Sequence, residues 1–301
     1  MDLKNVLNLS RHHKRAFIGI LILIVLLLVI IDLKFLQPVS TAAETSNIWS
    51  NYVQSIVAAL IVALFTFGVI QYFLPDDTEA KAMSNLEPTK ITAAFELQLA
   101  NATSWQYRGN FGRYLRGKVL PTLSAKTGMR ISACIIDPKD IDLCVEHSQY
   151  RTQINGIDKG KIYTVPIVQE EVLTTILICA WYAKSKSVTI DLYLTSVFDP
   201  IRTDASDKSM IVTVEDRRES ALLIQRSHFM FDHFGLQVLN VQKQGTKINL
   251  DSLPFRQSLS DITSEDAKQF FESIEMTAIC EQIGAETIIQ RCINVKNPYG
   301  S

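Results

Sequence analysis

Two long apolar runs open the chain, and a mixture of helical and alternating periodicity follows them. The first run, residues 16–31, has no charged residue, and its apolar character continues past two charged positions to Leu36. The second run, residues 56–74, is also uncharged. About 20 apolar residues are enough for a helix to cross a hydrocarbon core of roughly 30 Å. The pattern therefore predicts transmembrane helices at residues 16–36 and 56–74.

The charges around these runs predict which side of the membrane each part faces. The leader, residues 1–15, holds Lys and Arg in excess over a single Asp, whereas the loop at residues 37–55 holds no Lys or Arg. Cytoplasmic segments are enriched in Lys and Arg. We therefore expect an N-in, C-in topology, with most of the chain in the cytoplasm. A cleaved secretory signal is the alternative, but the first run is longer than the 7–15 residues of a signal core.

The cysteines and the net charge of the rest of the chain exclude several classes of function. All five cysteines follow the second apolar run, and no two of them form a C-x-x-C pair. An odd number without such a pair indicates reduced thiols rather than a disulfide framework or a zinc site. From Pro75 onward 25 basic residues face 28 acidic residues. This balance excludes a general nucleic-acid-binding surface, so any contact with an anion must be local.

After a polar linker at residues 75–89, residues 90–301 are long enough for one domain with its own hydrophobic core. Helical periodicity marks residues 91–102, 110–123, 139–151, 167–184, 264–276 and 285–292, and strand-like runs mark residues 129–137, 188–195, 210–215 and 221–226. Pro166 suits a first helical turn, and Ser264 is a candidate N-cap. Helices before and between strands predict an α/β or α+β cytoplasmic domain.

The sequence contains no complete catalytic motif. It lacks the G-x-S-x-G, G-x-x-x-x-G-K and G-x-G-x-x-G patterns. His228 and His233 lie five residues apart, which is not the i, i+4 spacing of a helical metal pair, and His147 stands apart from both. We therefore expect structural histidines, no metal, no cofactor and no catalytic residue.

An arginine-rich segment, "YRGNFGRYLR", is the best candidate for a binding site. It places cations where a helix begins, and the helix dipole disfavours positive charge there. An anion, a nucleic acid or an acidic protein partner would offset that charge. Asn110 is a candidate helix cap, and the free backbone N–H groups of the helix start could hold a phosphate. The candidate binding residues are Arg108, Asn110, Arg113 and Arg116. The alternative is that these arginines pair with carboxylates such as Glu146 or Asp137.

Small residues in the second apolar run suggest a surface for helix packing. Ser55, Ala59 and Ala63 fall four residues apart and therefore share one helix face. Small side chains allow helices to approach closely within lipid. The stripe is expected either to drive assembly of several chains or to pack on the first helix of the same chain.

Three segments carry a resemblance to a known class of proteins. They are "ATSWQYRGNFGRYLRGKVLP", "IIDPKDIDLCVEHSQYR" and "ESALLIQRSHFMF". With the two apolar runs, they resemble the membrane effectors of bacterial retron anti-phage systems. The cytoplasmic part also resembles a phospholipase-D-like domain that is catalytically degenerate, because the signature His is not followed by the family's Lys at residues 226–230.

The resemblance implies a toxin of the bacterial inner membrane that is held inactive by a reverse transcriptase and its RNA–DNA hybrid. On release, the toxin would assemble as a homo-oligomer, disrupt the membrane and cause abortive infection. Two other classes stay open: a membrane-anchored enzyme of lipase or nuclease type, and a nucleotide-sensing membrane adaptor.

Overall fold

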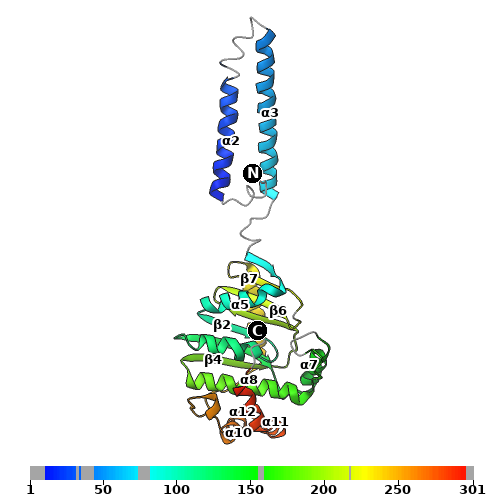
Figure 1. Cartoon of the computed structure of the whole chain (residues 1–301), viewed down its shortest axis with the longest axis vertical. Coiled ribbons are helices and arrows are strands. Elements are labelled where there is room, and N and C mark those ends of the chain that lie inside the picture. Colours follow the sequence, from blue (N-terminus) through cyan, green and yellow to red (C-terminus); the bar gives the residue numbers. More distant parts are fainter. Residues whose placement is uncertain are drawn as a thin grey trace. The chain divides into compact units, whose positions relative to one another are not determined.

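The computed structural model of the chain describes residues 11–31, 34, 44–73, 82–154, 159–216 and 218–295. The chain divides into two compact units, Met1–Ala80 and Lys81–Ser301 (Figure 1). Parts of the predicted leader, spans, outer loop and linker, at residues 1–10, 32–33, 35–43 and 74–81, lie outside the described residues.

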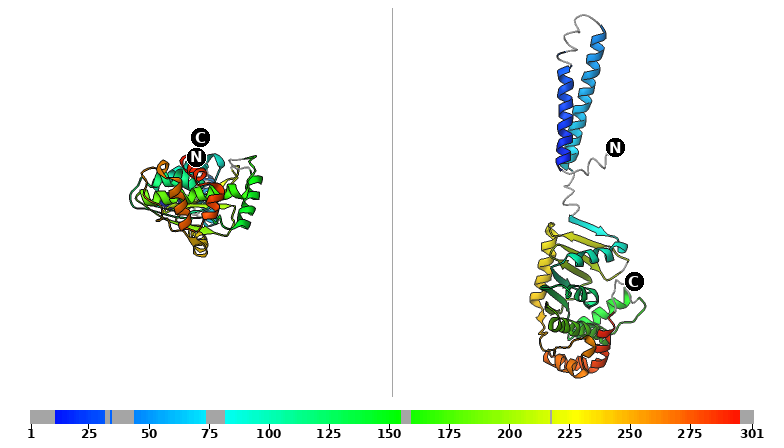
Figure 2. Two further views of the ribbon diagram at one scale, coloured as in Figure 1. Left: turned by 90° about the horizontal axis from the view of Figure 1, so that it is seen from below. Right: turned by 60° about the vertical axis from the view of Figure 1, so that its left-hand side comes forward.

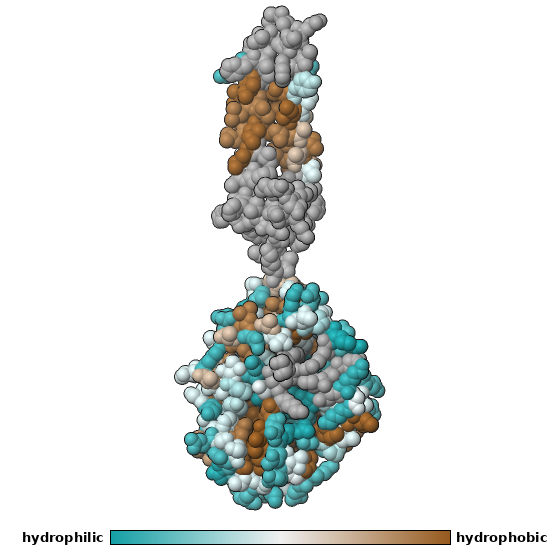
Figure 3. All heavy atoms as spheres, in the orientation of Figure 1, coloured by the Kyte–Doolittle hydropathy of each residue, from teal (hydrophilic) through white to brown (hydrophobic). Residues whose placement is uncertain are grey.

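In the described part of the N-terminal unit, two helices lie side by side: α2 (Arg11–Ile31) and α3 (Glu44–Phe73) (Figure 1). Partly buried residues of α3, at Val57, Leu60 and Leu64, recur on one helix face and form the stripe that faces α2. Many other large apolar side chains are exposed: Ile20, Leu23, Leu26, Leu27 and Ile30 on α2, and Ile56, Ile61, Val62 and Phe65 on α3. The outer surface of the pair is therefore strongly apolar (Figure 3).

The prediction of two N-terminal transmembrane helices is wrong. Among the described residues, only α8 (Val165–Ser185) combines the length and hydropathy of a membrane span, and 78% of its apolar window is buried inside the C-terminal unit. Within the described ranges, the apolar stretches of the N-terminal helices are shorter than a span, at Ile22–Ile31 and Asn51–Thr66.

The C-terminal unit is built on one eight-stranded mixed sheet with the strand order β1-β7-β6-β5-β2-β3-β4-β8. The strands are β1 (Met83–Leu86), β2 (Ser104–Arg108), β3 (Met129–Ile136), β4 (Val188–Thr195), β5 (Ile201–Ser206), β6 (Ser209–Val214), β7 (Ala221–Gln225) and β8 (Thr246–Lys247). Strands β2, β3 and β4 run parallel, and the remaining neighbours pair antiparallel. The end of β3 is buried on both faces, at Cys134, Ile135 and Ile136, as is typical of a parallel strand covered by helices.

Helices cover both faces of this sheet (Figure 2). One face carries α5 (Pro88–Asn101), the π-helical turn η2 (Leu115–Val119) with its continuation α6 (Leu120–Leu123), α7 (Ile141–Gln153) and α8. The other face carries α9 (Phe229–Gln244), over a separate apolar cluster that includes Met210, Ile224 and Phe231. The C-terminal helices are α10 (Ser264–Ser273), α11 (Thr277–Ile283) and α12 (Ala285–Ile293), of which α11 and α12 contact α8.

Helix α8 is the centre of the hydrophobic core. Strand β4 contacts it on one side and α11 and α12 contact it on another, so its middle turns have no solvent-facing side. A helix in such a position is expected to be apolar all round. Val172, Ile176 and Leu177 are fully buried accordingly. This packing also fixes the polar side chains on the first turns of α8, which build the site described next.

Most of the predicted elements in the C-terminal unit are confirmed. The predicted helices at residues 91–102, 139–151 and 167–184 correspond to α5, α7 and α8, and the four predicted strands correspond to β3, β4, β6 and β7. The helix predicted at residues 110–123 begins later, at residue 113, because residues 109–112 form a turn. Ser264 is not the cap of α10, since the side chain of Thr263 accepts the N–H of Asp266 instead. Strand β1 and the start of α5 lie within the stretch interpreted as a linker.

Replacing Gly112 with Ala should destabilise the C-terminal unit. Gly112 has φ of +69°, and a Cβ atom there would lie 2.7 Å from Cγ2 of Thr175. We expect Gly112→Ala to lower the free energy of unfolding by about 3 kcal/mol, through left-handed strain and the steric clash together. Gly128 has φ of +72° but open space around a Cβ. Gly128→Ala should therefore cost only about 1 kcal/mol. Urea unfolding followed by tryptophan fluorescence compares the two, and equal losses would contradict the close approach of Gly112 to Thr175.

Candidate functional site

The candidate site lies at the carboxyl ends of the parallel strands β2 and β3. Ligands of open α/β sheets bind beyond this edge, where loops leave the strands. After β2 the chain continues the ladder briefly, with Gly109 N–H donating to Cys134 O (3.1 Å) and Ile136 N–H donating to Asn110 O (3.3 Å). It then turns at Gly112 and starts a helix, which brings Arg113 and Arg116 to this edge.

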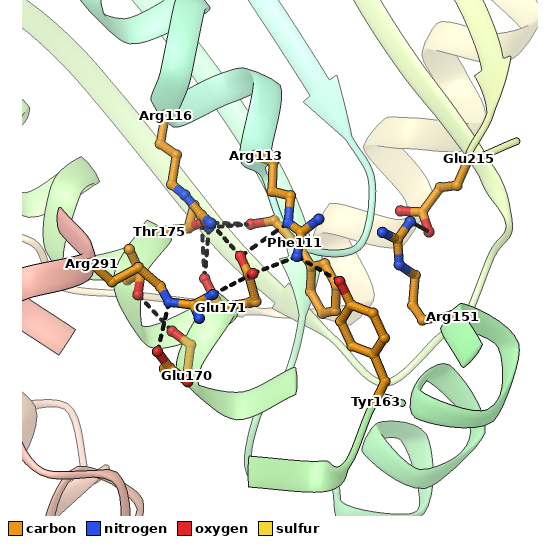
Figure 4. Close-up of polar contacts among 11 residues, drawn as sticks. Phe111, Arg113, Arg116, Arg151, Tyr163, Glu170, Glu171, Thr175, Glu215 and Arg291 are labelled. Atoms are coloured by element: carbon orange, nitrogen blue, oxygen red, sulfur yellow. Dashed lines mark hydrogen bonds and ion pairs between the residues drawn. The ribbon is translucent and has the colours of Figure 1, made fainter. Parts of the chain in front are cut away.

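Glu171, near the start of α8, is the centre of a cluster of arginines (Figure 4). Arg113 donates from Nε to Oε2 of Glu171 (3.1 Å) and from Nη2 to Oε1. Arg116 donates from Nη2 to Oε2, and Arg291, on α12, donates from Nη1 to Oε1. The two carboxylate oxygens therefore accept four hydrogen bonds, which fills the acceptor capacity of the group. We call Arg113, Arg116, Arg291 and Glu171 the Glu171 cluster.

The electrostatics of Glu171 follow from burial and from its three cations. Burial alone would raise the pKa of this carboxyl, since the charged form loses solvation. The charges of Arg116 and Arg113 act in the opposite direction and are stronger, so they hold the pKa of Glu171 well below its usual range. Glu171 is therefore ionised whenever the protein is folded near neutral pH.

Further hydrogen bonds and an ion pair hold Arg116 and Arg291 in position. Arg116 Nη1 also donates to the backbone oxygen of Glu171 (2.8 Å) and to Oγ1 of Thr175 (2.5 Å). Thr175 in turn donates to the backbone oxygen of Phe111 (2.5 Å). Arg291 Nε lies 2.6 Å from Oε1 of Glu170. The cluster thereby ties the turn after β2, the start of α8 and the C-terminal helix α12 together.

A second group of cations lies close to the ring of Tyr163, and Figure 4 shows two of them, Arg113 and Arg151. Arg113 Nη2 donates to the Tyr163 hydroxyl (2.8 Å). The guanidinium carbon of Arg151, on α7, lies 5.2 Å from the ring centroid, and Lys161 Nζ lies at the same distance. Arg151 also donates to Oε2 of Glu215 at the end of β6 (3.0 Å). We call Arg113, Arg151, Lys161 and Tyr163 the Tyr163 group.

His147 adjoins this group and is fully buried among aromatic rings. Its ring centroid lies 4.5 Å from that of Phe111 in an edge-to-face arrangement and 5.5 Å from that of Phe198. Neither ring nitrogen has a hydrogen-bond partner among the residues that the structure describes. Burial lowers the pKa of His147 to about 4, so the imidazole is neutral at physiological pH. A buried histidine without any polar partner is unusual and requires a reason.

The predicted binding residues all lie near this edge, but protein carboxylates hold the arginines. Arg108 pairs with Asp199 (2.7 Å), and Arg113 and Arg116 pair with Glu171. The Asn110 side chain donates to the backbone oxygen of Asp199 (3.2 Å) rather than capping a helix. The arginines therefore do pair with carboxylates, which was the alternative in the sequence analysis. The partners are Glu171 and Asp199 rather than Glu146 or Asp137. The anion-binding role itself stays a prediction.

Sequence reasoning missed several residues that complete the site. These are Arg151, Tyr163, Glu170, Glu171, Glu215 and Arg291. The one usable signal was the pair of glutamates in the first turns of α8, a helix that is otherwise mostly apolar. Arg291 is 120 residues from Glu171 in the chain, and no local pattern connects the two.

The other candidates from the sequence lie away from this site. His228 caps α9, accepting the N–H of Met230 at Nδ1 (3.2 Å), and His233 is exposed on the same helix. All five cysteines are buried and unbridged. Burial raises the pKa of Cys134, Cys144, Cys179 and Cys292 to about 12, which keeps these groups as thiols. Within the described residues no group of three or more His, Cys, Asp or Glu could hold a metal ion.

In the N-terminal unit, Ser55, Ala59 and Ala63 are exposed. The stripe that faces α2 is built instead from larger residues of α3 such as Val57 and Leu60. The small residues therefore do not form the contact with the first helix of the same chain, and their role in assembly stays a prediction.

Removing the charge of Glu171 should strongly destabilise the protein. Glu171→Gln keeps the shape of the side chain but leaves three guanidinium groups without their shared carboxylate. Breaking a buried ion pair in this way is expected to lower the free energy of unfolding by about 3–5 kcal/mol. Asp191→Asn is the control, because Asp191 pairs with the exposed Arg130 and Lys247 and should lose at most about 1 kcal/mol. Chemical denaturation measures both, and similar losses would show that the Glu171 cluster is no stronger than a surface pair.

The buried His147 should make folding sensitive to mild acid. Its pKa falls from the ordinary value of 6.5 to about 4 in the folded protein. The unfolded chain then binds a proton that the folded chain does not, so stability is full above pH 6.5 and falls as the pH drops toward 4. The loss across this window should reach about 3 kcal/mol. His147→Phe should remove this part of the pH dependence, whereas His233→Phe, at an exposed position, should leave it. Unfolding curves at several pH values that match for wild type and His147→Phe would contradict the assignment.

Comparisons with known proteins do not identify a family. No family model matches the chain, and no curated protein matches it. Among solved structures, TrmBL2, an archaeal chromatin protein with a novel mode of DNA binding, is similar over 67% of this chain and 68% of its own, with 12% identity and a TM-score of 0.34. A likeness this weak supports no conclusion about fold or function. No comparison tests the resemblance to a phospholipase-D-like domain or to retron effectors, so both stay predictions.

Proposed function

We propose that this chain is a membrane-damaging effector of bacterial anti-phage defence, of the retron type, in which the C-terminal unit controls the N-terminal unit. A reverse transcriptase with its RNA–DNA hybrid holds the effector inactive. When phage interference releases it, several chains assemble at the inner membrane and disrupt it. The C-terminal unit faces the cytoplasm and acts by binding rather than by catalysis.

The observation that supports membrane action is the apolar surface of α2 and α3. Large side chains such as Leu23, Val62 and Phe65 are 60–72% exposed, although water makes such exposure unfavourable. Contiguous apolar surface of this kind marks a contact with lipid or with other proteins.

The case for assembly rests on geometry. A single pair of helices encloses no path for water, so damage to a membrane requires several chains. The exposed stripe of Ser55, Ala59 and Ala63 offers a surface on which helices of neighbouring chains approach closely. The case for a binding role of the C-terminal unit is the charged site at the sheet edge, whose cations are held in place by Glu171.

Membrane action is tested by adding a charge to the exposed apolar surface. Phe65→Glu should leave the contact between α2 and α3 intact, because Phe65 is 72% exposed. It should nevertheless move the protein from the membrane fraction to the soluble fraction and abolish depolarisation of cells that express it without a partner. The control is Asn51→Glu, which adds the same charge at a polar position of α3 and should change neither result. Depolarisation by Phe65→Glu at the wild-type rate would refute membrane action through this surface.

The proposed partner is tested separately. A tagged chain purified from its native host before phage infection should retain a reverse transcriptase and an RNA–DNA hybrid, and should lose them after infection. A complex with neither component, or one that infection leaves unchanged, would exclude the retron mechanism without affecting the test of membrane action.

A further inference from the structure

Helix α9 carries apolar side chains on two opposite sides. On the side that meets the sheet, Phe231 and Val238 are buried, and the main contacts of the helix are with strands β3, β4, β7 and β8. On the outer side, Phe229 is 75% exposed, Leu236 59% and Leu239 44%. A surface helix is expected to carry one apolar stripe, which faces the core. The packing of this unit therefore does not explain the outer apolar side chains of α9.

The outer side of α9 follows a heptad pattern. Phe229, Leu236 and Lys243 are seven residues apart, and Asp232 and Leu239 fall between them at steps of three and four. These spacings are those of the a and d positions of a coiled coil, which form one narrow line along a helix. All five side chains are exposed. Single exposed apolar residues are common on protein surfaces, but a continuous line of this kind is not. We call these five residues the α9 seam.

The α9 seam is complementary to itself when a second copy runs antiparallel. With a two-fold axis midway between Leu236 and Leu239, each of these leucines faces the other one on the second copy. The same axis lies midway between Asp232 and Lys243, so each carboxylate faces the ammonium group of the other copy. An apolar centre between two acid–base pairs suits a two-fold contact, in which every residue pair occurs twice.

Other occupants fit the α9 seam less well. A parallel second copy would set Asp232 against Asp232 and Lys243 against Lys243, so like charges would repel. A helix that lies on a membrane surface is rich in Lys and Arg beside its apolar face. In α9, Lys243 is the one Lys or Arg, and the charge of Asp232 offsets it. The charges therefore favour a second copy of the chain that runs in the antiparallel direction.

We propose that α9 is a dimerisation surface, on which a second copy of this chain packs its own α9 antiparallel through the α9 seam. The partner of Asp232 within the chain does not prevent this contact. Arg226 lies 3.1 Å from Asp232, but the two side chains are 60% and 66% exposed, so the carboxylate stays open to a second cation. One helix from each copy makes a small contact beside the roughly 1,600 Å² of a standard interface, so the dimer is reversible. The inference concerns the C-terminal unit alone and does not depend on the proposed membrane action.

Disulfide trapping in the full-length chain, in a neutral detergent, tests where the two copies meet. One chain carries Leu236→Cys and a differently tagged chain carries Leu239→Cys, and the five native cysteines are buried. Under mild oxidation we expect a disulfide between the two kinds of chain to form faster than a disulfide between two chains of the same kind, because residues 236 and 239 face each other. The control mixes Leu236→Cys with Lys268→Cys, at an exposed position of α10, and should give no disulfide.

A charge reversal tests the register of the two helices. Asp232→Lys, added to both cysteine chains, sets two cations together at each end of the contact and should slow the mixed disulfide about tenfold. Adding Lys243→Asp to the same chains brings back opposite charges in the antiparallel register and should restore the rate. Both positions are exposed, so the melting temperature of each variant should stay close to that of wild type.

Three results would overturn the proposal: no mixed disulfide, a faster disulfide between chains of the same kind, or a rate that the charge reversal leaves unchanged. A membrane is the other molecule to be tested against the α9 seam. The Leu236→Cys chain is therefore also reconstituted at less than one copy per vesicle of phosphatidylcholine and phosphatidylglycerol. Protection of the introduced thiol from a water-soluble maleimide there would assign α9 to lipid and would also overturn the proposal. None of these outcomes alters the depolarisation assay with Phe65→Glu, so the two proposals fail separately.

Discussion

The carboxylate of Glu171 is the interaction on which the charged edge of the sheet depends. It joins the helix after β2, helix α8 and helix α12 through three guanidinium groups, although these segments are far apart in sequence. Its position is set by apolar packing, because α8 is buried between β4 and the C-terminal helices. The arginines therefore do not place Glu171. Instead, Glu171 holds the arginines in position. Because the fold excludes water from this carboxylate, removing one partner of the ion pair costs much of the free energy of unfolding.

A comparison of two electrostatic energies explains why arginines are stable at the start of a helix here. The helix dipole disfavours a cation at this position by about 0.3–1 kcal/mol. A buried ion pair that loses one partner costs about 3–5 kcal/mol. The pairing of Arg113 and Arg116 with Glu171 therefore outweighs the dipole, and no ligand is needed to explain these two residues. Beside them, Arg151 pairs with Glu215, and both Arg151 and Lys161 lie close to the ring of Tyr163.

Local patterns predicted the elements of the C-terminal unit better than its site. Periodicity located α5, α7, α8 and four strands because each buries one face or all faces of a regular element. It missed β2, whose alternation is short and includes Arg108, and it missed α9, whose exposed side includes Phe229 and Leu236. The partners of the arginines were not predictable, because Glu171 and Arg291 meet through tertiary packing alone. The span prediction was wrong because, among the described residues, only the buried helix α8 combines the length and hydropathy of a span.

The described residues of the two units present different kinds of surface. The N-terminal unit exposes apolar side chains, and the C-terminal unit gathers cations. The N-terminal helices bury a narrow stripe at Val57, Leu60 and Leu64 and turn much larger apolar side chains outward. The C-terminal unit buries its apolar side chains in the core around α8 and places the cations of Arg151 and Lys161 beside Tyr163. Apolar surface is compensated by lipid or by other apolar helices, and positive charge is compensated by an anion.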